Sequence, residues 1–172
     1  MNPFSRAFET LLDDYFSAFY REHPADAALL GLNSDDARFN PSTLSALRRQ
    51  QAKRRDALSK LDTVAPSALS NEQNLDRLAF RARLLRECEE FDRGRHELDP
   101  DGIDKVLSFL LKELQHGEDT PKRAAKNIRN LLRDTPRYLS QAARLVTRPE
   151  RVWRNIMADA FNASGLFFDA VT

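Results

Sequence analysis

The sequence predicts an all-α protein, and three observations support this fold class. Only 5 of the 172 residues are glycine, too few for a turn-rich sheet protein. Apolar residues recur three and four positions apart along almost every segment, whereas no segment alternates apolar and polar residues as a half-buried strand does. Proline also follows a helix-capping residue at several places. We therefore expect an array of about seven to eight helices, mostly antiparallel neighbours, with no sheet.

The first three helices are expected in the opening third of the chain. Pro3 opens a helix that runs to about Glu22, and Pro24 opens a short one. Gly31 ends the short helix, because glycine adopts the left-handed conformation without steric cost. After a loop that begins at residue 33, Asn40 and Pro41 cap a third helix whose polar middle, "RRQQAKRRD", should face solvent. Its predicted apolar side consists of Leu44, Leu47, Leu58 and Leu61.

Ser70 and Gln73 form a capping box before the fourth helix, which should end near Gly94. Its apolar residues include one stripe, formed by Leu75, Leu78, Ala82 and Leu85, with Leu84, Cys88 and Phe91 beside it. A fifth long helix is expected from Asp99 and Pro100 to Gly117. Its apolar positions fit one helix face without a miss: Ile103, Val106, Leu107, Leu110, Leu111 and Leu114.

Three further proline signals divide the last third of the chain. Thr120 and Pro121 cap a helix through Leu132, and Thr135 and Pro136 cap a separate helix through Leu145. Pro149 opens the last segment, which carries apolar residues up to the end of the sequence.

The length fits one domain, so we expect residues 1–172 to form a single helical domain. Acidic residues interrupt the opening segment where a signal peptide needs an apolar run, and no run reaches the roughly 18 apolar residues of a membrane span. These features favour a cytoplasmic protein with no membrane partner. Cys88 is the only cysteine, which excludes an internal disulfide and is typical of a small buried core residue.

No set of residues predicts catalysis. His96 and Glu97 resemble the start of a zinc-protease helix, but Pro100 occupies the position of the second histidine. The capping signal of Pro100 places the pair in a loop that ends a helix, and the other histidines, His23 and His116, are distant in sequence. We expect no catalytic, cofactor-binding or metal-binding residue in this chain.

Two surfaces are candidates for partner binding. The net charge is +1, yet residues 121–155 hold ten Lys or Arg against two acidic residues. Four of these cations, at spacings of four, three and four, form a predicted basic face: Lys122, Lys126, Arg129 and Arg133. The last segment supplies a predicted aromatic packing face: Trp153, Phe161, Phe167 and Phe168. Exposed apolar faces of this kind usually mark an interface.

Three stretches carry a family resemblance: "FETLLDDYFSAFYREHPADAALLGLNSDDARF", "LSNEQNLDRLAFRARL" and "LRDTPRYLSQAARLVTRPERVW". With them, nearly the whole chain resembles the N-terminal region of a bacterial family known as domain of unknown function 885. The resemblance implies a mostly helical, metallopeptidase-like protein with a zinc-binding His-Glu-x-x-His helix after the matched region. No residue of this chain matches that motif, so any zinc would belong to a downstream domain.

Three functional hypotheses follow from the sequence. The first is a non-catalytic helical N-terminal domain of a longer, metallopeptidase-like protein, which shapes substrate access and packs on a downstream catalytic domain. The second is a self-contained helical interaction module, such as a homodimer joined through the aromatic packing face. The third, nucleic-acid binding through the basic face, lacks the interleaved aromatic residues that stack on bases.

Overall fold

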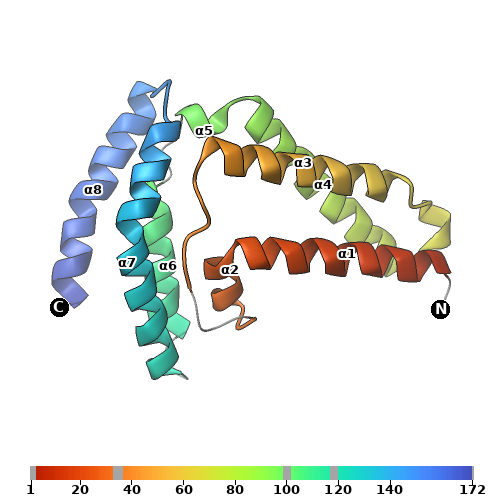
Figure 1. Cartoon of the computed structure of the whole chain (residues 1–172), viewed down its shortest axis with the longest axis horizontal. Helices are drawn as coiled ribbons and strands as arrows, with labels where there is room; N and C mark the ends of the chain where they lie inside the picture. The colour runs from red at the N-terminus through yellow and green to blue at the C-terminus, as the bar shows by residue number, and fades with distance from the viewer. Residues whose placement is uncertain (1–2, 33–36, 99–101, 117–119, 172) are drawn as a thin grey trace. The chain divides into compact units, whose positions relative to one another are not determined.

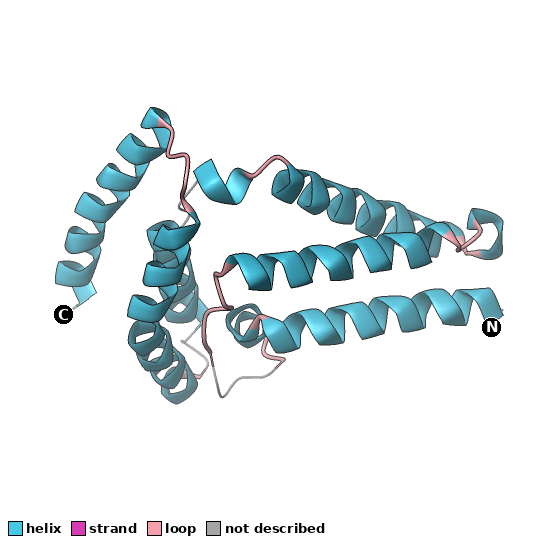
Figure 2. Ribbon diagram, turned by 45° about the horizontal axis from the view of Figure 1, so that its top comes forward, coloured by secondary structure: helices cyan, strands magenta, loops and turns pink. Residues whose placement is uncertain are grey.

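The computed structural model describes the backbone of residues 3–32, 37–98, 102–116 and 120–171. Side chains are described for the same residues except 3–4, 116 and 166–171. Over these ranges the chain forms eight α-helices and one short 3-10 helix, without a strand (Figures 1 and 2). The all-α prediction is confirmed. No helix in the described ranges is long and apolar enough to cross a membrane.

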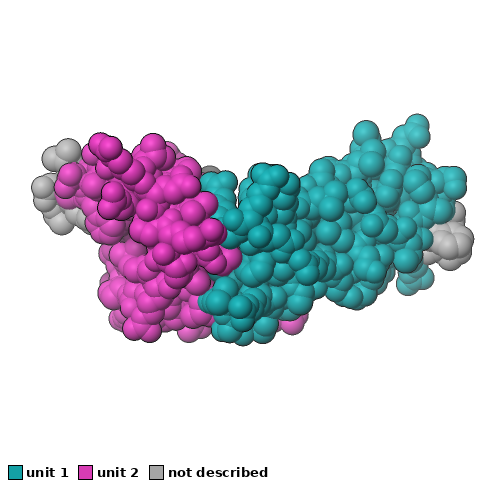
Figure 3. Space-filling model, turned by 90° about the horizontal axis from the view of Figure 1, so that it is seen from above, with its two compact units in different colours: residues 1–19, 44–95 teal, residues 20–43, 96–172 magenta. Residues whose placement is uncertain are grey.

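The described chain divides into two compact units, coloured separately in Figure 3. Unit 1 contains residues 1–19 and 44–95, and unit 2 contains residues 20–43 and 96–172. Each unit has its own cluster of buried apolar side chains. The expectation of one domain over residues 1–172 stays a prediction, and each unit is described by itself below.

Unit 1 is built from most of α1 (Pro3–Glu22), α3 (Leu44–Asp62), the 3-10 helix Pro66–Ala68 and α4 (Asn71–Asp92). Its core holds Phe8, Leu61 and Leu84, all fully buried. The predicted capping box is present, because Ser70 Oγ accepts the Gln73 N–H and Gln73 Oε1 accepts the Ser70 N–H. Gln73 Nε2 also donates to Ser5 Oγ at 2.6 Å, so the cap that starts α4 ties it to α1.

Unit 2 is built from the end of α1, α2 (Pro24–Leu29), all but the first residue of α5 (Arg95–Leu98), α6 (Gly102–His116), α7 (Pro121–Leu145) and α8 (Arg151–Val171). Phe39 belongs to its core, with its ring stacked on Tyr138 at 4.6 Å between centroids and edge-on to Phe109 at 5.9 Å. The Phe39 N–H donates to Asp134 Oδ2 at 2.9 Å, and its carbonyl accepts from Arg137 at 2.7 Å. Phe39 is therefore fastened to α7 through its backbone as well as its ring.

The predicted start of the third helix is wrong by three residues, since α3 begins at Leu44 and not at Pro41. The Ser42 N–H donates to Gln141 Oε1 at 3.0 Å, and hydrogen bonds to α7 hold this segment without regular structure. The end of α2 agrees with the prediction, because Gly31 has a φ of 71° in the left-handed region. The predicted capping residues Asp99 and Pro100 and the predicted stop at Gly117 lie outside the described residues.

The two helices predicted on either side of Thr135 are one helix. Pro136 lies inside α7, where it lacks the N–H that Leu132 O would accept and where proline usually costs about 3 kcal/mol. Its side chain is exposed, whereas Leu131 and Tyr138 before and after it are both buried in the same core. The helix continues because both of its halves cover one core.

The leucine stripe of the fourth helix is not the side that packs in the core of unit 1. Phe80, Leu84 and Cys88 are the buried residues of α4, whereas Leu75, Leu78 and Leu85 are exposed. The three buried residues lie on the opposite side of the helix from the leucine stripe. Both sides are apolar, and packing against the rest of unit 1 covers only one of them.

Candidate functional site

The His96–Glu97 pair lies in a helix, which corrects the predicted loop. Both residues belong to the single turn α5, Arg95–Leu98. Glu97 serves to hold this turn in unit 2: its carboxylate pairs with Arg148 Nε at 2.7 Å, and its carbonyl accepts the Arg148 N–H at 3.0 Å. A structural ion pair of this kind does not prepare a carboxylate to activate water.

The described part of the chain holds no group of three or more His, Cys, Asp or Glu side chains placed to bind a metal ion. Cys88 is buried, and burial raises the pKa of its thiol above the usual value. Because the thiolate is the nucleophile, this environment favours the unreactive thiol. The structure therefore gives Cys88 a packing role.

The polar middle of α3 faces α4 and not only solvent, which corrects the sequence prediction. Gln51 is buried, and its Nε2 donates to Cys88 O at 3.2 Å and Asp92 Oδ1 at 3.1 Å. Arg54 Nε pairs with Glu87 Oε2 at 2.8 Å, and both side chains are largely covered. This layer of charged and polar groups specifies how α3 packs on α4.

The same layer reaches the aromatic residues of α1. Glu87 also accepts from Arg83 at 2.8 Å, and the Arg83 guanidinium lies 5.3 Å from the centre of the Phe19 ring. Burial, with a smaller contribution from the nearby Glu87 carboxylate, raises the pKa of the Tyr15 hydroxyl. A tyrosine with a raised pKa stays protonated, so Tyr15 is neutral here. The contacts of Glu87 with Arg54 and Arg83 therefore form a packed ion-pair network within unit 1.

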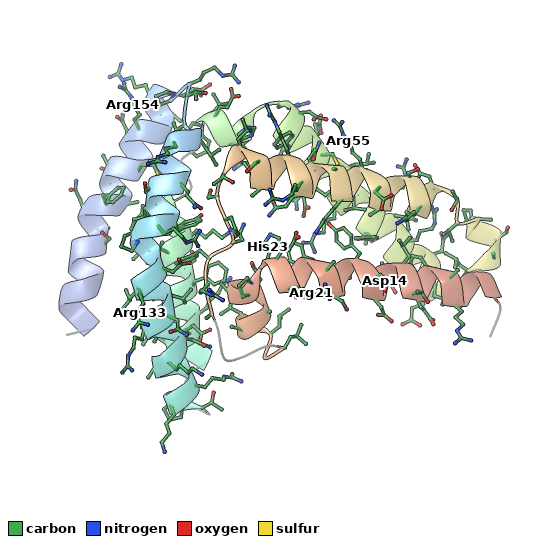
Figure 4. The ribbon with its side chains drawn as sticks, viewed as in Figure 1. Asp14, Arg21, His23, Arg55, Arg133 and Arg154 are labelled. Atoms are coloured by element: carbon green, nitrogen blue, oxygen red, sulfur yellow. The ribbon has the colours of Figure 1, made fainter. Side chains whose placement is uncertain are left out.

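All four residues of the predicted basic face are exposed on α7: Lys122, Lys126, Arg129 and Arg133. They lie on the side of the helix opposite Leu131 and Asn127, both fully buried, and Figure 4 shows Arg133 projecting outward. The one aromatic residue of α7, Tyr138, is buried and stacked on Phe39, so it does not offer a platform for bases. This face has the features of a solvated helix side.

The predicted aromatic packing face falls on α8 but does not form one continuous described patch. Trp153 is half-buried, Phe161 is 53% exposed, and the side chains of Phe167 and Phe168 lie outside the described residues. The buried line of α8 contains Met157 and Ser164.

Two residues outside the predicted aromatic face change the description of α8. Val152 and Ile156 lie one turn apart and are 60% and 45% exposed. They lie on one side of the buried line, and Phe161 lies on the other. The apolar pattern of the sequence included both aliphatic residues, but only the structure shows that they are uncovered.

A second uncovered apolar surface lies on α4, where Leu75, Leu78 and Leu85 are 68%, 49% and 44% exposed. We call these three residues, with exposed Ala82 between them, the leucine seam. The sequence pattern identified the same four residues as one stripe of the helix.

The comparisons with known proteins do not identify a relative: no protein-family model, curated protein or solved structure matches the chain.

Proposed function

We propose that residues 1–172 form a non-catalytic helical packing module of a metallopeptidase-like bacterial protein. In this proposal α8 packs against a catalytic domain that follows in the same polypeptide, and the module shapes access to that domain. The family resemblance of the sequence motivates the metallopeptidase part of the proposal, and any zinc would be bound downstream. The cytoplasmic location expected from the sequence belongs to the same proposal.

The observation that carries this proposal is the incomplete covering of α8. The helix is held to the core of unit 2 by a narrow line of residues, in which Met157 is buried and Ala160 is partly buried. Apolar side chains on both sides of that line are exposed: Val152 and Ile156 on one side and Phe161 on the other. A helix that is apolar on three sides gains stability when further surfaces cover it.

Site-specific labelling tests whether the rest of the polypeptide covers α8. In a Cys88→Ala background, Ile156→Cys and Asn162→Cys each introduce one thiol on α8, at a proposed contact and at an exposed polar position. Both thiols should react rapidly with a maleimide in the chain of residues 1–172. In the product of the complete open reading frame, the thiol at 156 should be protected and the thiol at 162 should stay reactive.

Two results would contradict the proposal. One is a reading frame that ends at Thr172 or encodes no His-Glu-x-x-His motif after it. The other is equal labelling of both positions in the complete protein. Protection of position 156 in residues 1–172 alone, together with a dimeric mass, would instead support the self-contained interaction module.

A further inference from the structure

The leucine seam of α4 has the spacing of a contact between two helices. Its four residues, Leu75, Leu78, Ala82 and Leu85, follow each other at intervals of three, four and three. This is the a and d pattern by which two helices pack side by side. The opposite side of α4 is already buried, with Leu84 fully covered in the core of unit 1. The seam is therefore an additional apolar surface of a helix that has already packed.

We propose that the seam binds the same seam of a second copy of this chain, with the two α4 helices antiparallel. In this register Leu75 packs against Leu85 of the second copy, and Leu78 packs against Ala82 of the second copy. At each end of the seam a leucine packs against a leucine of the second copy. In the middle, each Leu78 packs against an alanine of the second copy. The pairing is symmetric, as a closed homodimer requires.

The charges beside the seam favour the antiparallel direction. One edge carries Glu72, Ala79 and Arg86 at intervals of seven residues, and all three are exposed. In an antiparallel pair this edge meets the same edge of the second copy, so Glu72 faces Arg86 of the second copy, twice by symmetry. A parallel pair would instead bring Arg81 against Arg86 of the second copy and place like charges together.

On the other edge of the seam, Arg81 lies beside Arg81 of the second copy. A carboxylate within unit 1 already neutralises each of these cations. Arg81 Nε pairs with Asp62 Oδ1 at 2.8 Å, which links α4 to the end of α3. The dimer axis therefore brings together two arginine–aspartate pairs and not two uncompensated arginines. Charge complementarity on the first edge and local neutralisation on the second are the reasons for choosing a second copy as the occupant.

The seam runs from Leu75 to Leu85, about 15 Å along the helix, which is short for an interface. We therefore expect a weak dimer whose population rises with concentration and which dissociates on dilution. Its surface lies on α4 in unit 1, whereas the proposed function concerns α8 in unit 2, so the two proposals succeed or fail separately.

Charge exchange tests the pairing by sedimentation velocity over a wide concentration range. Glu72→Arg and Arg86→Glu should each weaken dimerisation by about tenfold, because each places like charges together at both symmetric contacts. The double variant Glu72→Arg/Arg86→Glu should restore dimerisation. Asp13→Arg, a matched charge change at an exposed position of α1, should have no effect. Circular dichroism should show that all variants keep the helical fold.

Cross-linking tests the direction in a Cys88→Ala background. Ala79 lies beside Ala79 of the second copy in the antiparallel register, so Ala79→Cys should be joined by a short bis-maleimide. Asn71 lies about 27 Å from its counterpart, since 18 residues at 1.5 Å separate them along the helix, so Asn71→Cys should not be joined.

A chain that is monomeric at every concentration overturns the proposal. So does cross-linking at position 71 as well as 79, which indicates parallel helices. A dimer that ignores the charge exchange but is lost on Val152→Glu or Ile156→Glu also overturns it and places the contact on α8.

Discussion

Two leucine-to-alanine substitutions on α4 distinguish the buried side of this helix from its exposed side. Leu84 has no exposed surface and Leu75 is 68% exposed, although the sequence places both among the apolar residues of the helix. Leu84→Ala removes about three methylene equivalents from the core, worth about 2.4 kcal/mol of transfer free energy before the cavity is counted. The total cost should be about 2–5 kcal/mol in the free energy of unfolding.

The same change at Leu75 should cost much less. About a third of its surface is covered, so the transfer term is at most about 0.8 kcal/mol, and no enclosed cavity is left. Both substitutions keep high helix propensity, so the difference between them reports packing.

Urea unfolding followed by far-ultraviolet circular dichroism measures both values. Samples should be dilute, so that any association through the leucine seam is absent. Equal losses of stability for the two variants, or a larger loss for Leu75→Ala, would refute the assignment of the core side of α4.

Three further outcomes are expected. Pro136→Ala should raise the free energy of unfolding by about 1 kcal/mol or more, because alanine restores the N–H that Leu132 O lacks in α7; a separate helix starting at Pro136 would show little change in the same urea titration. Cys88 should react with a thiol reagent only as the protein unfolds, since it is buried and burial raises its pKa; rapid reaction of the folded chain would contradict this. The pairing of Asp62 with Arg81 lowers the pKa of Asp62 below its ordinary value of 3.8, so its contribution to stability is present above that pH and is lost as the pH falls through the lowered pKa. The Asp62→Asn variant should therefore have a lower free energy of unfolding than the unsubstituted chain near neutral pH, and the difference should disappear in strong acid. A difference that persists in strong acid would show that the effect does not come from the ion pair.

The sequence predicted the helices wherever the determining contacts are local. Ser70 and Gln73 form the expected capping box, and Gly31 ends α2 in the left-handed conformation. The amphipathic pattern of α6 places Ile103, Val106 and Leu110 in the core as expected, whereas Leu111 and Leu114 of the same predicted face are exposed. These signals involve residues within one or two turns of each other, so they can be recognised in the sequence without knowledge of the fold.

The candidate surfaces were predicted only in part. Exposure of the basic face, which includes Arg129, follows from the stripe of apolar residues on the other side of α7. The aromatic pattern of the last segment indicated a packing helix, but not that Val152 and Ile156 are more open than Trp153. That difference depends on which side of α8 faces α6, a choice that the apolar pattern leaves open because several sides of α8 are apolar.

The sequence by itself determined that the chain is helical and where α1, α2 and α4 begin and end, because capping and helical periodicity act over a few neighbouring residues. Only the tertiary structure decided which apolar side of α4 is buried and whether Pro136 interrupts α7. Both outcomes depend on surfaces supplied by distant segments: α1 and α3 cover Leu84 and leave Leu75 exposed. A single core, shared by Leu131 and Tyr138, holds α7 together through its proline.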